Sequence, residues 1–151
     1  MRAAKYPPLG ARSWGGYTAL QASGLGAAEY LKEANRMTMV FAMIETVQAL
    51  DAVEDIAATP GLDGLFVGPS DLSITLSNGA GIDRTGPATL AAMARIARAA
   101  KANGLVAGAW GGPAENCRKF MELGYTFLAA PTEVDLLQAG AAGFVKAVKA
   151  G

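Results

Sequence analysis

The stretch that decides the fold is residues 37–67, MTMVFAMIETVQALDAVEDIAATPGLDGLFV. It opens with a short apolar run, Met37–Glu45, that ends in a carboxylate. In Thr46–Thr59 the apolar residues recur at helical spacing, and a Pro-Gly pair ends this segment. A second apolar run, Leu65–Val67, follows a turn. The stretch therefore predicts a strand, an amphipathic helix and a second, buried strand.

The same alternation continues to the end of the chain. A loop rich in Ser, Asn and Gly occupies Ser77–Gly86. The elements predicted after it are a helix Pro87–Asn103, a strand Leu105–Trp110, a helix Pro113–Leu123, a strand Tyr125–Ala130 and a helix Thr132–Lys149. Strands joined by helices are parallel, and runs that are apolar at every position are typical of a sheet covered on both faces. The sequence therefore predicts an α/β fold, either a doubly wound sheet or part of a (β/α)₈ barrel.

Chain length and missing motifs favour the barrel. A complete barrel takes about 250 residues, and this chain has 151. No Gly-x-Gly-x-x-Gly or Walker-type motif follows a predicted strand, so a nucleotide-binding doubly wound sheet is disfavoured. We therefore expect a single domain, residues 1–151, that forms the C-terminal half of a TIM barrel. Residues 1–36, rich in Gly and Pro, are a leading loop or helix segment, and 37–151 hold about four β/α units.

Composition excludes several kinds of function. The chain has 13 Lys and Arg against 13 Asp and Glu, so it lacks the cationic surplus that binding to nucleic acid needs. It has no His and a single Cys, Cys117, which excludes His-based triads and Cys/His zinc sites. The longest apolar stretch, Met39–Ile44, is too short to span a bilayer, and no signal peptide pattern opens the chain. We expect a cytoplasmic protein that binds neither nucleic acid nor membranes.

Two carboxylates follow neighbouring predicted strands. Glu45 ends the first run, and Asp71 comes shortly after the second. Since the carboxyl ends of parallel strands meet at one edge, these groups predict an oxygen-rich site for Mg²⁺ or Mn²⁺. The alternative is that each carboxylate is only an N-cap or first-turn residue of the helix that follows it, where it satisfies free N–H groups and the helix dipole.

The run Gly68-Pro69-Ser70-Asp71-Leu72-Ser73 is the most informative stretch. Gly68 allows a ligand to approach the backbone closely, and Pro69 fixes the turn. The amides of Ser70 and Asp71 are then available to a carboxylate or phosphate. The alternative is an ordinary turn from strand to helix in which Ser70 or Asp71 is the cap.

Three segments together resemble a known family. MIET at 43–46, IAATPGLDGLFVGPSDLS at 56–73 and YPPLGARS at 6–13 are similar to the C-terminal portion of the HpcH/HpaI aldolase/citrate lyase family, in particular its metal-dependent class II pyruvate aldolases. The resemblance implies a (β/α)₈ barrel. It also implies a lyase that cleaves 2-keto-3-deoxy sugar acids or 4-hydroxy-2-oxo acids into pyruvate and an aldehyde.

The resemblance assigns roles to five residues of this chain. Glu45 and Asp71 match the two ligands of a divalent ion, Mg²⁺, Mn²⁺ or Co²⁺. The backbone at Gly68 and Ser70 matches the part that holds the pyruvate carboxylate, and Trp110 falls near a position that lines the aldehyde side. The bound ion would act as a Lewis acid on the substrate.

This chain differs from the family pattern at several positions. The family's catalytic His and Arg belong to the first half of the barrel, so no catalytic residue is assigned in this chain, and Arg12 is not the equivalent of that Arg. Met43 stands where several relatives carry Gln, and a Met in an apolar run is typically core filler.

Either the chain is part of a longer protein, or it is a half-barrel completed by another chain. Little turnover is expected from it alone.

Two other functions remain open at this stage. One is a non-catalytic module that binds a metal ion or a 2-oxo acid, or a structural partner subunit, which the missing His and Arg favour. The other is a lyase of acyl-CoA esters that resembles the citrate lyase β subunit. For the aldolase as for these alternatives, we expect a homo-oligomer or pairing with the missing N-terminal half. The last helix, Thr132–Lys149, either contacts another subunit, as the resemblance implies, or covers its own sheet.

Overall fold

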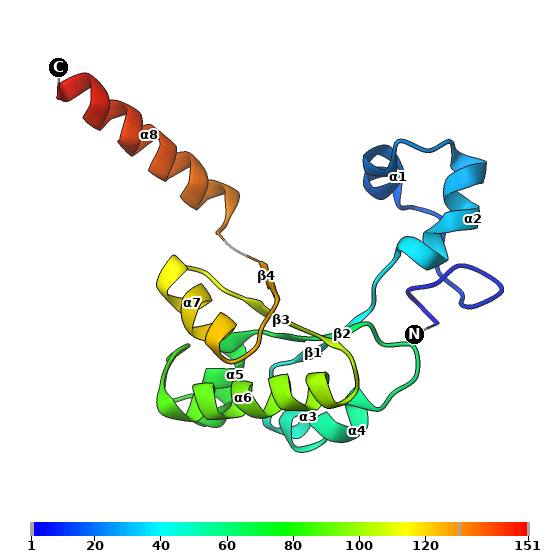
Figure 1. Cartoon of the computed structure of the whole chain (residues 1–151), viewed down its shortest axis with the longest axis horizontal. Coiled ribbons are helices and arrows are strands. Elements are labelled where there is room, and N and C mark those ends of the chain that lie inside the picture. Colours follow the sequence, from blue (N-terminus) through cyan, green and yellow to red (C-terminus); the bar gives the residue numbers. More distant parts are fainter. Residues whose placement is uncertain (1, 130, 151) are drawn as a thin grey trace.

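A computed structural model describes residues 2–129 and 131–150 of the chain. Its centre is a four-stranded parallel sheet made of β1 (Phe41–Ile44), β2 (Gly64–Val67), β3 (Val106–Trp110) and β4 (Phe127–Ala129) (Figure 1). The spatial order of the strands is the same as their order along the chain. A doubly wound sheet reverses its order at a switch point, whereas a barrel does not. The predicted α/β fold is therefore confirmed, in its barrel form.

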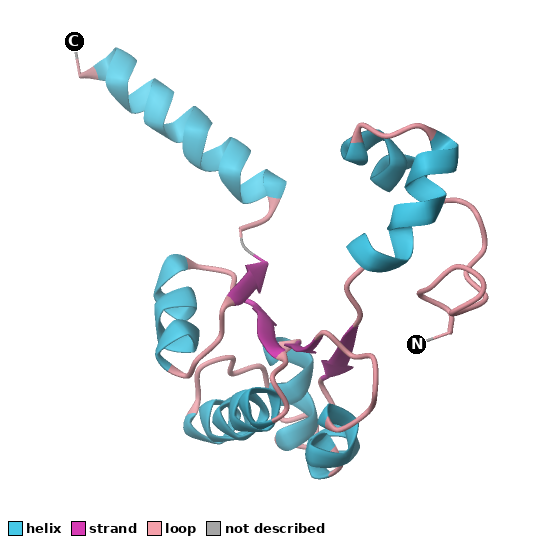
Figure 2. Ribbon diagram, turned by 45° about the vertical axis from the view of Figure 1, so that its right-hand side comes forward, coloured by secondary structure: helices cyan, strands magenta, loops and turns pink. Residues whose placement is uncertain are grey.

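Helices connect the strands and extend both ends of the chain. They are α1 (Tyr17–Ser23), α2 (Ala27–Met37), α3 (Val47–Asp51), α4 (Val53–Ala57), α5 (Pro69–Leu76), α6 (Pro87–Ala102), α7 (Ala114–Glu122) and α8 (Glu133–Lys149). Helices α3 to α6 lie along one face of the sheet (Figure 2). This one-sided arrangement is what a segment of a barrel wall requires.

One predicted helix is divided in two. The segment Thr46–Thr59, predicted as a single helix, forms α3 and α4 with a break at Ala52. At the break, Arg95 of α6 donates to the carbonyl of Asp51 over 3.3 Å. A continuous helix would use that carbonyl for its own hydrogen bond, so a tertiary contact competes with the helical pattern.

Two predicted strands are shorter than expected. Residues 37–40 do not belong to β1, because α2 runs to Met37 and Thr38 still donates its amide to the Ala34 carbonyl over 2.9 Å. In the last predicted strand, Tyr125 donates its amide to the Phe120 carbonyl at the end of α7, so β4 begins only at Phe127. Ala130, the predicted end of that strand, lies outside the described residues.

The leading segment has a small core of its own. Tyr6, Tyr30 and Ala34 are buried together, with Leu20 and Leu25 packed against them. The side chain of Asn35 in α2 accepts from the amide of Tyr6 over 2.7 Å and donates to its carbonyl over 3.0 Å. These contacts hold the N-terminal loop on α2. Within residues 2–36 the structure describes helices and loop and no strand.

The main core lies between the sheet and its helices. Alternate residues of the strands point to this side and are almost fully buried, among them Ile44, Leu65, Val67 and Ala109. From the other side they meet the buried face of α6, including Met93 and Ile96, together with Phe120 of α7. Full burial of a Val, Leu, Ile, Phe or Met side chain contributes about 1.5–3 kcal/mol to folding.

The opposite face of the sheet carries aromatic rings. The ring centroids of Phe41, Phe66 and Phe127 lie 5.2–6.5 Å apart. Gly108 leaves room for them, because a Cβ there would lie 2.9 Å from the Phe66 ring. In a closed barrel this face is the interior, but Met43 is 53 % exposed and Phe127 is 49 % exposed. The interpretation of Met43 as core filler is therefore wrong for this chain.

Helix α8 stands away from the sheet (Figure 1). It starts with a capping box, in which the Thr132 hydroxyl accepts from the amide of Asp135 while the Asp135 carboxylate accepts from the amide of Thr132. None of its described residues is buried, and Leu137 and Phe144 are about 70 % exposed. The helix therefore does not cover its own sheet, which was one of its two predicted roles.

Other expectations about the whole chain stay predictions. These are its organisation as one domain, its cytoplasmic location and its lack of nucleic-acid partners. In the part of the chain that the structure describes, no helix combines the length and the apolar character needed to cross a membrane.

The buried hydroxyl of Tyr125 tests the packing between α6 and the sheet. It donates to the Met93 carbonyl over 3.0 Å, and burial raises its pKa. We expect Tyr125→Phe to lower the free energy of unfolding by about 1 kcal/mol at pH 7. Burial favours the neutral phenol in the folded chain. The stability that Tyr125 provides to the wild type is therefore fully present below the ordinary tyrosine pKa of about 10, and it is lost as the pH rises above that value. The variant should therefore lose less stability than the wild type between about pH 9 and about pH 11, a range that brackets the ordinary tyrosine pKa of about 10.

Urea denaturation across this pH range measures both effects. Tyr17→Phe is the matched control, since Tyr17 is 67 % exposed. Equal stability of Tyr125→Phe and wild type at pH 7, or an unchanged alkaline loss of stability, would contradict the assignment.

Candidate functional site

The candidate site lies at the carboxyl edge of the sheet. In the parallel register Ile44 pairs with Val67, and Val67 pairs with Ala109. The next residues along these three strands are Glu45, Gly68 and Trp110. The register therefore brings three of the five predicted site residues into one row, and the other two, Ser70 and Asp71, begin the helix that follows Gly68.

The two predicted metal ligands converge on one point. A Cβ added to Gly68 would lie 2.9 Å from Oε2 of Glu45 and 3.5 Å from Oδ2 of Asp71. Gly68 has φ −92°, which any residue can adopt, so backbone geometry does not require glycine here, and a side chain would instead displace the end of Glu45. The two carboxylates therefore both lie beside the space above the Cα of Gly68, which we call the hollow and which a side chain at this position would crowd.

Neither carboxylate acts as a helix cap. The N-cap of α3 is Thr46, whose hydroxyl accepts from the amide of Ala49 over 3.1 Å. The N-cap of α5 is Gly68, and α5 has no side-chain cap. Asp71 lies in the first turn of α5, where its charge interacts favourably with the helix dipole. The alternative of a cap or first-turn role is thus wrong for Glu45, whereas Asp71 does occupy the first turn that this alternative describes. Ser70 is not the N-cap of α5.

The end of β1 is tied to α5. The hydroxyl of Thr75 donates to the backbone carbonyl of Glu45 over 3.2 Å and to that of Leu72 over 3.1 Å. Leu72 is fully buried in the main core. The contact that ties Glu45 to α5 is therefore made by its backbone carbonyl. The carboxylate of Glu45 takes no part in that contact.

The donor set fits a hard divalent ion with few protein ligands. Within residues 2–129 and 131–150, no group of three or more Asp, Glu, His or Cys side chains is placed to hold a metal ion. Two carboxylates suffice for Mg²⁺, which keeps several water ligands and is often held by one or two carboxylates together with its substrate. Glu45 and Asp71 could therefore hold such an ion while leaving positions for a ligand.

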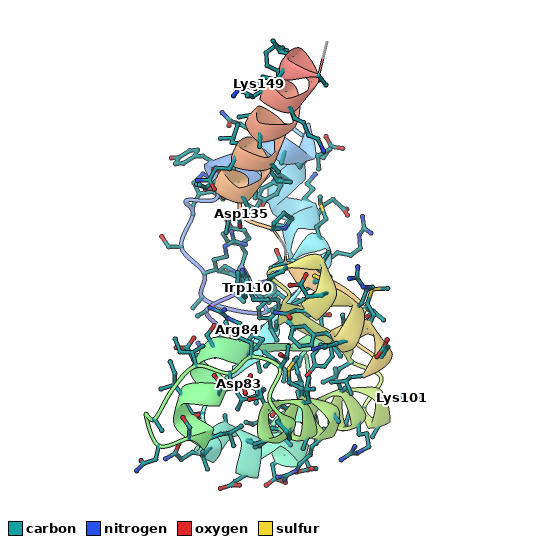
Figure 3. The ribbon with its side chains drawn as sticks, turned by 90° about the vertical axis from the view of Figure 1, so that its left-hand side faces the viewer. Asp83, Arg84, Lys101, Trp110, Asp135 and Lys149 are labelled. Atoms are coloured by element: carbon teal, nitrogen blue, oxygen red, sulfur yellow. The ribbon has the colours of Figure 1, made fainter. Side chains whose placement is uncertain are left out.

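A third charged residue, Arg84, lies at the same edge of the sheet, and the sequence did not predict it. Nε of Arg84 donates to Oγ of Ser70 over 2.7 Å, and its guanidinium carbon lies 5.3 Å from the centroid of the Trp110 ring (Figure 3). Gly112, at φ +61°, allows the Trp110 ring to lie against the backbone, because a Cβ there would come within 2.9 Å of the ring. Arg84 belongs to the loop between α5 and α6, whose Gly-rich sequence gave no signal of its own.

The comparisons with known proteins agree on one family. A family model described as HpcH/HpaI aldolase/citrate lyase matches residues 2–139. The chain is 36 % identical over 137 residues to a hydroxypyruvate/pyruvate aldolase of Paraburkholderia phytofirmans, covering 89 % of this chain and 52 % of that one. It is 33 % identical to a 5-keto-4-deoxy-D-glucarate aldolase of Escherichia fergusonii, covering 91 % of this chain and 53 % of the other.

A solved structure supports the same fold. An HpcH/HpaI aldolase/citrate lyase family protein from Burkholderia cenocepacia matches with a TM-score of 0.76 and 33 % identity, over 98 % of this chain and 58 % of the other. The chain spans about half the length of the curated relatives it matches.

Gly68 provides a direct test of the hollow. We expect Gly68→Ala to weaken Mn²⁺ binding about tenfold, a size typical of changes that misplace a ligand, because the added Cβ displaces the Glu45 carboxylate. Isothermal titration calorimetry measures the affinity, and thermal melting should show an unchanged fold.

Gly81→Ala is the control for this substitution. Gly81 lies in the next loop and has nothing within 4 Å of an added Cβ. An affinity for Mn²⁺ that stays the same in Gly68→Ala would show that the hollow is not where the ion binds.

Proposed function

The chain belongs to the HpcH/HpaI aldolase/citrate lyase family, and from this premise we propose that it provides the metal and pyruvate site of a class II pyruvate aldolase. The substrates would be 2-keto-3-deoxy sugar acids or 4-hydroxy-2-oxo acids, cleaved into pyruvate and an aldehyde. The names of the relatives fit this class, since they describe aldolases of pyruvate and of a keto-deoxy sugar acid. The observation that carries the proposal is the convergence of Glu45 and Asp71 on the hollow at Gly68.

Each site residue has a separate task in this proposal. Glu45 and Asp71 hold a divalent ion, Mg²⁺, Mn²⁺ or Co²⁺. Such an ion, when bound, supplies a Lewis acid for the negative charge that develops on the keto oxygen as the carbon–carbon bond breaks. The amides of Ser70 and Asp71, in the first turn of α5, have no carbonyl partner within the helix and can donate to the pyruvate carboxylate.

The remaining residues shape the space around the ligand. Gly68 leaves the hollow open between the two carboxylates. Trp110, at the end of β3, lies two strands away from Glu45, a distance of about 10 Å at ordinary strand spacing. We place the aldehyde half of the substrate on that side.

Proton transfer is not assigned to any residue of this chain. The sequence contains no His, and the resemblance places the family's catalytic His and Arg in the first half of the barrel. We therefore propose that these 151 residues bind the ion and pyruvate but turn over substrate only together with a half-barrel that supplies those groups.

A non-catalytic partner subunit is the second candidate function. The half-exposed interior face of the sheet, with Met43 and Phe127, favours it. Apolar surface of this kind is typically covered by another chain or domain. In that role the chain would still bind the ion and the 2-oxo acid.

Self-association through α8 follows from the same premise. Its exposed apolar side chains include Leu137 and Phe144. Such a face, on a helix none of whose described residues is buried, is typical of a subunit contact. We expect the wild type to form oligomers at micromolar concentration. Light scattering should show dissociation in Leu137→Glu/Phe144→Glu but not in Gln138→Glu, which adds charge to the same helix. A monomeric wild type would contradict this contact.

Metal binding is the direct test of the proposed function. We expect Mn²⁺ to bind once per chain in isothermal titration calorimetry, and pyruvate to strengthen that binding. Glu45→Gln and Asp71→Asn should each weaken it at least about tenfold, since each removes a charged ligand. Asp55→Asn is the control, because Asp55 lies exposed on α4.

Two outcomes would count against the proposal. A folded wild-type chain that binds no Mn²⁺ with or without pyruvate would leave the family relation as ancestry only. Binding that survives in both site variants would place the ion elsewhere in the chain.

A further inference from the structure

The N-terminal segment contains a buried hydroxyl that has no hydrogen-bond partner. Tyr6 is 2 % exposed, and its Oη is the buried side-chain polar atom of the described residues that forms no hydrogen bond. The backbone amide and carbonyl of Tyr6 are both bonded to the side chain of Asn35. A buried hydroxyl costs free energy unless it is hydrogen-bonded, so a hydroxyl left without a partner needs an explanation.

Two further donors lie around the same point. A Cβ added to Gly16 would lie 2.9 Å from Nη2 of Arg12 and 3.6 Å from Oη of Tyr6. The same point lies 3.7 Å from Oη of Tyr30, a residue that is 4 % exposed. Guanidinium N–H groups and phenol O–H groups both donate to oxyanions. One guanidinium and two phenols therefore converge beside a glycine.

A cavity of about 420 Å³ opens next to these donors. Its polar lining comes from Arg12, Ser23, Tyr30 and Thr38, and the rest of its lining is apolar. Nη1 of Arg12 donates to Oγ1 of Thr38 over 3.5 Å. In the part of the chain that the structure describes, no Asp or Glu side chain lines this cavity. A ligand there meets a positive charge and hydroxyl groups but no carboxylate, which favours an anion.

The charge of Arg12 is not neutralised by an ion pair within residues 2–129 and 131–150. The ion pairs between side chains in those ranges are Arg36–Glu33 and Arg95–Glu54. The guanidinium carbon of Arg12 instead lies 4.8 Å from the centroid of the Tyr6 ring. A contact with an aromatic ring orients a guanidinium without taking up its N–H donors. The charge and most of the donors of Arg12 are therefore available to a ligand.

Lys5 compensates the negative end of α2 beside the cavity. Its Nζ donates to the carbonyls of Asn35 and Thr38, where α2 ends. The carboxyl end of a helix carries partial negative charge, which would otherwise repel an anion at this place. The ammonium group of Lys5 therefore adds a second positive charge near the cavity.

We propose that Arg12, Tyr6 and Tyr30 form a binding site for a small tetrahedral oxyanion, of which inorganic phosphate is the simplest. The donors come from three separate places in the segment, and a tetrahedral group presents oxygens in several directions, whereas a carboxylate presents two in one plane. The site is separate from the proposed metal site, because Thr38 precedes β1 and Glu45 follows it. Helices α1 and α2 also stand apart from α3 to α6 (Figure 1). The inference does not depend on the proposed function.

Isothermal titration calorimetry with inorganic phosphate tests the site. The titrations are made in EDTA, so that no phosphate binds through a divalent ion. We expect phosphate to bind once per chain and at least about tenfold more tightly than acetate, because a planar carboxylate meets fewer of the donors.

Substitution of Arg12 locates the bound phosphate. Arg12→Gln should weaken binding at least about tenfold, the size expected for a hydrogen bond between charged groups. Arg12→Lys should keep part of the affinity, because lysine retains the charge but not the planar donor set. Arg84→Gln is the matched control, since Arg84 lies at the carboxyl edge of the sheet, and it should bind phosphate like the wild type.

Tyr6→Phe separates a role in binding from a structural role. Without phosphate, this variant should melt at the wild-type temperature or above it, because the hydroxyl that it removes forms no hydrogen bond. Bound phosphate stabilises the folded chain by mass action, so the wild type should gain more in melting temperature than Tyr6→Phe as phosphate is added. Tyr17→Phe is the control, because Tyr17 is 67 % exposed, and it should follow the wild type.

Four outcomes would overturn the proposal. The first is a folded wild-type chain that binds no phosphate, and the second is acetate that binds as tightly as phosphate. The third is binding that survives in Arg12→Gln but is lost in Arg84→Gln, which would place the anion at the other edge of the sheet. The fourth is an equal loss of stability in Tyr6→Phe with and without phosphate, which would show that the hydroxyl serves the fold alone.

Discussion

The packing of the outer face of the sheet against α6 is the constraint on which the rest of the structure depends. Side chains such as Leu65, Val67 and Ala109 are buried there, and a strand shifted by one residue would turn all of its side chains to the opposite face. The apolar pattern therefore fixes the register of β1, β2 and β3. That register in turn decides which residues stand side by side where the strands end.

The candidate site follows from this register and from the glycine at position 68, which has no side chain. Because Ile44 and Val67 pair, Glu45 and Gly68 are neighbours, and the space above Gly68 receives carboxylate oxygens from Glu45 and Asp71. Oxygen ligands brought together in this way are a cost in the absence of a cation, since like charges repel. This arrangement is the support for the proposed cation site.

The loop between α5 and α6 adds the opposite charge to the same edge. Two buried hydroxyls, on Ser73 and Thr89, hold its backbone at Asp83, and Arg84 then reaches Ser70 and Trp110. The site thus has an acidic part at β1 and α5 and a basic part over β3.

The sequence by itself determined the α/β class and the positions of the strands to within a few residues. It also determined that two carboxylates come shortly after neighbouring strands. Hydrophobic period and chain order are local properties, so the sequence alone is enough to show them. Only the tertiary structure decided that α3 and α4 are separate, that Met43 is exposed and that α8 leaves its own sheet. It also placed Arg84, which comes from a loop without periodicity and reaches Ser70 and Trp110 through contacts between residues 14 and 26 positions apart. Contacts of this kind depend on how elements pack, and no local pattern encodes them.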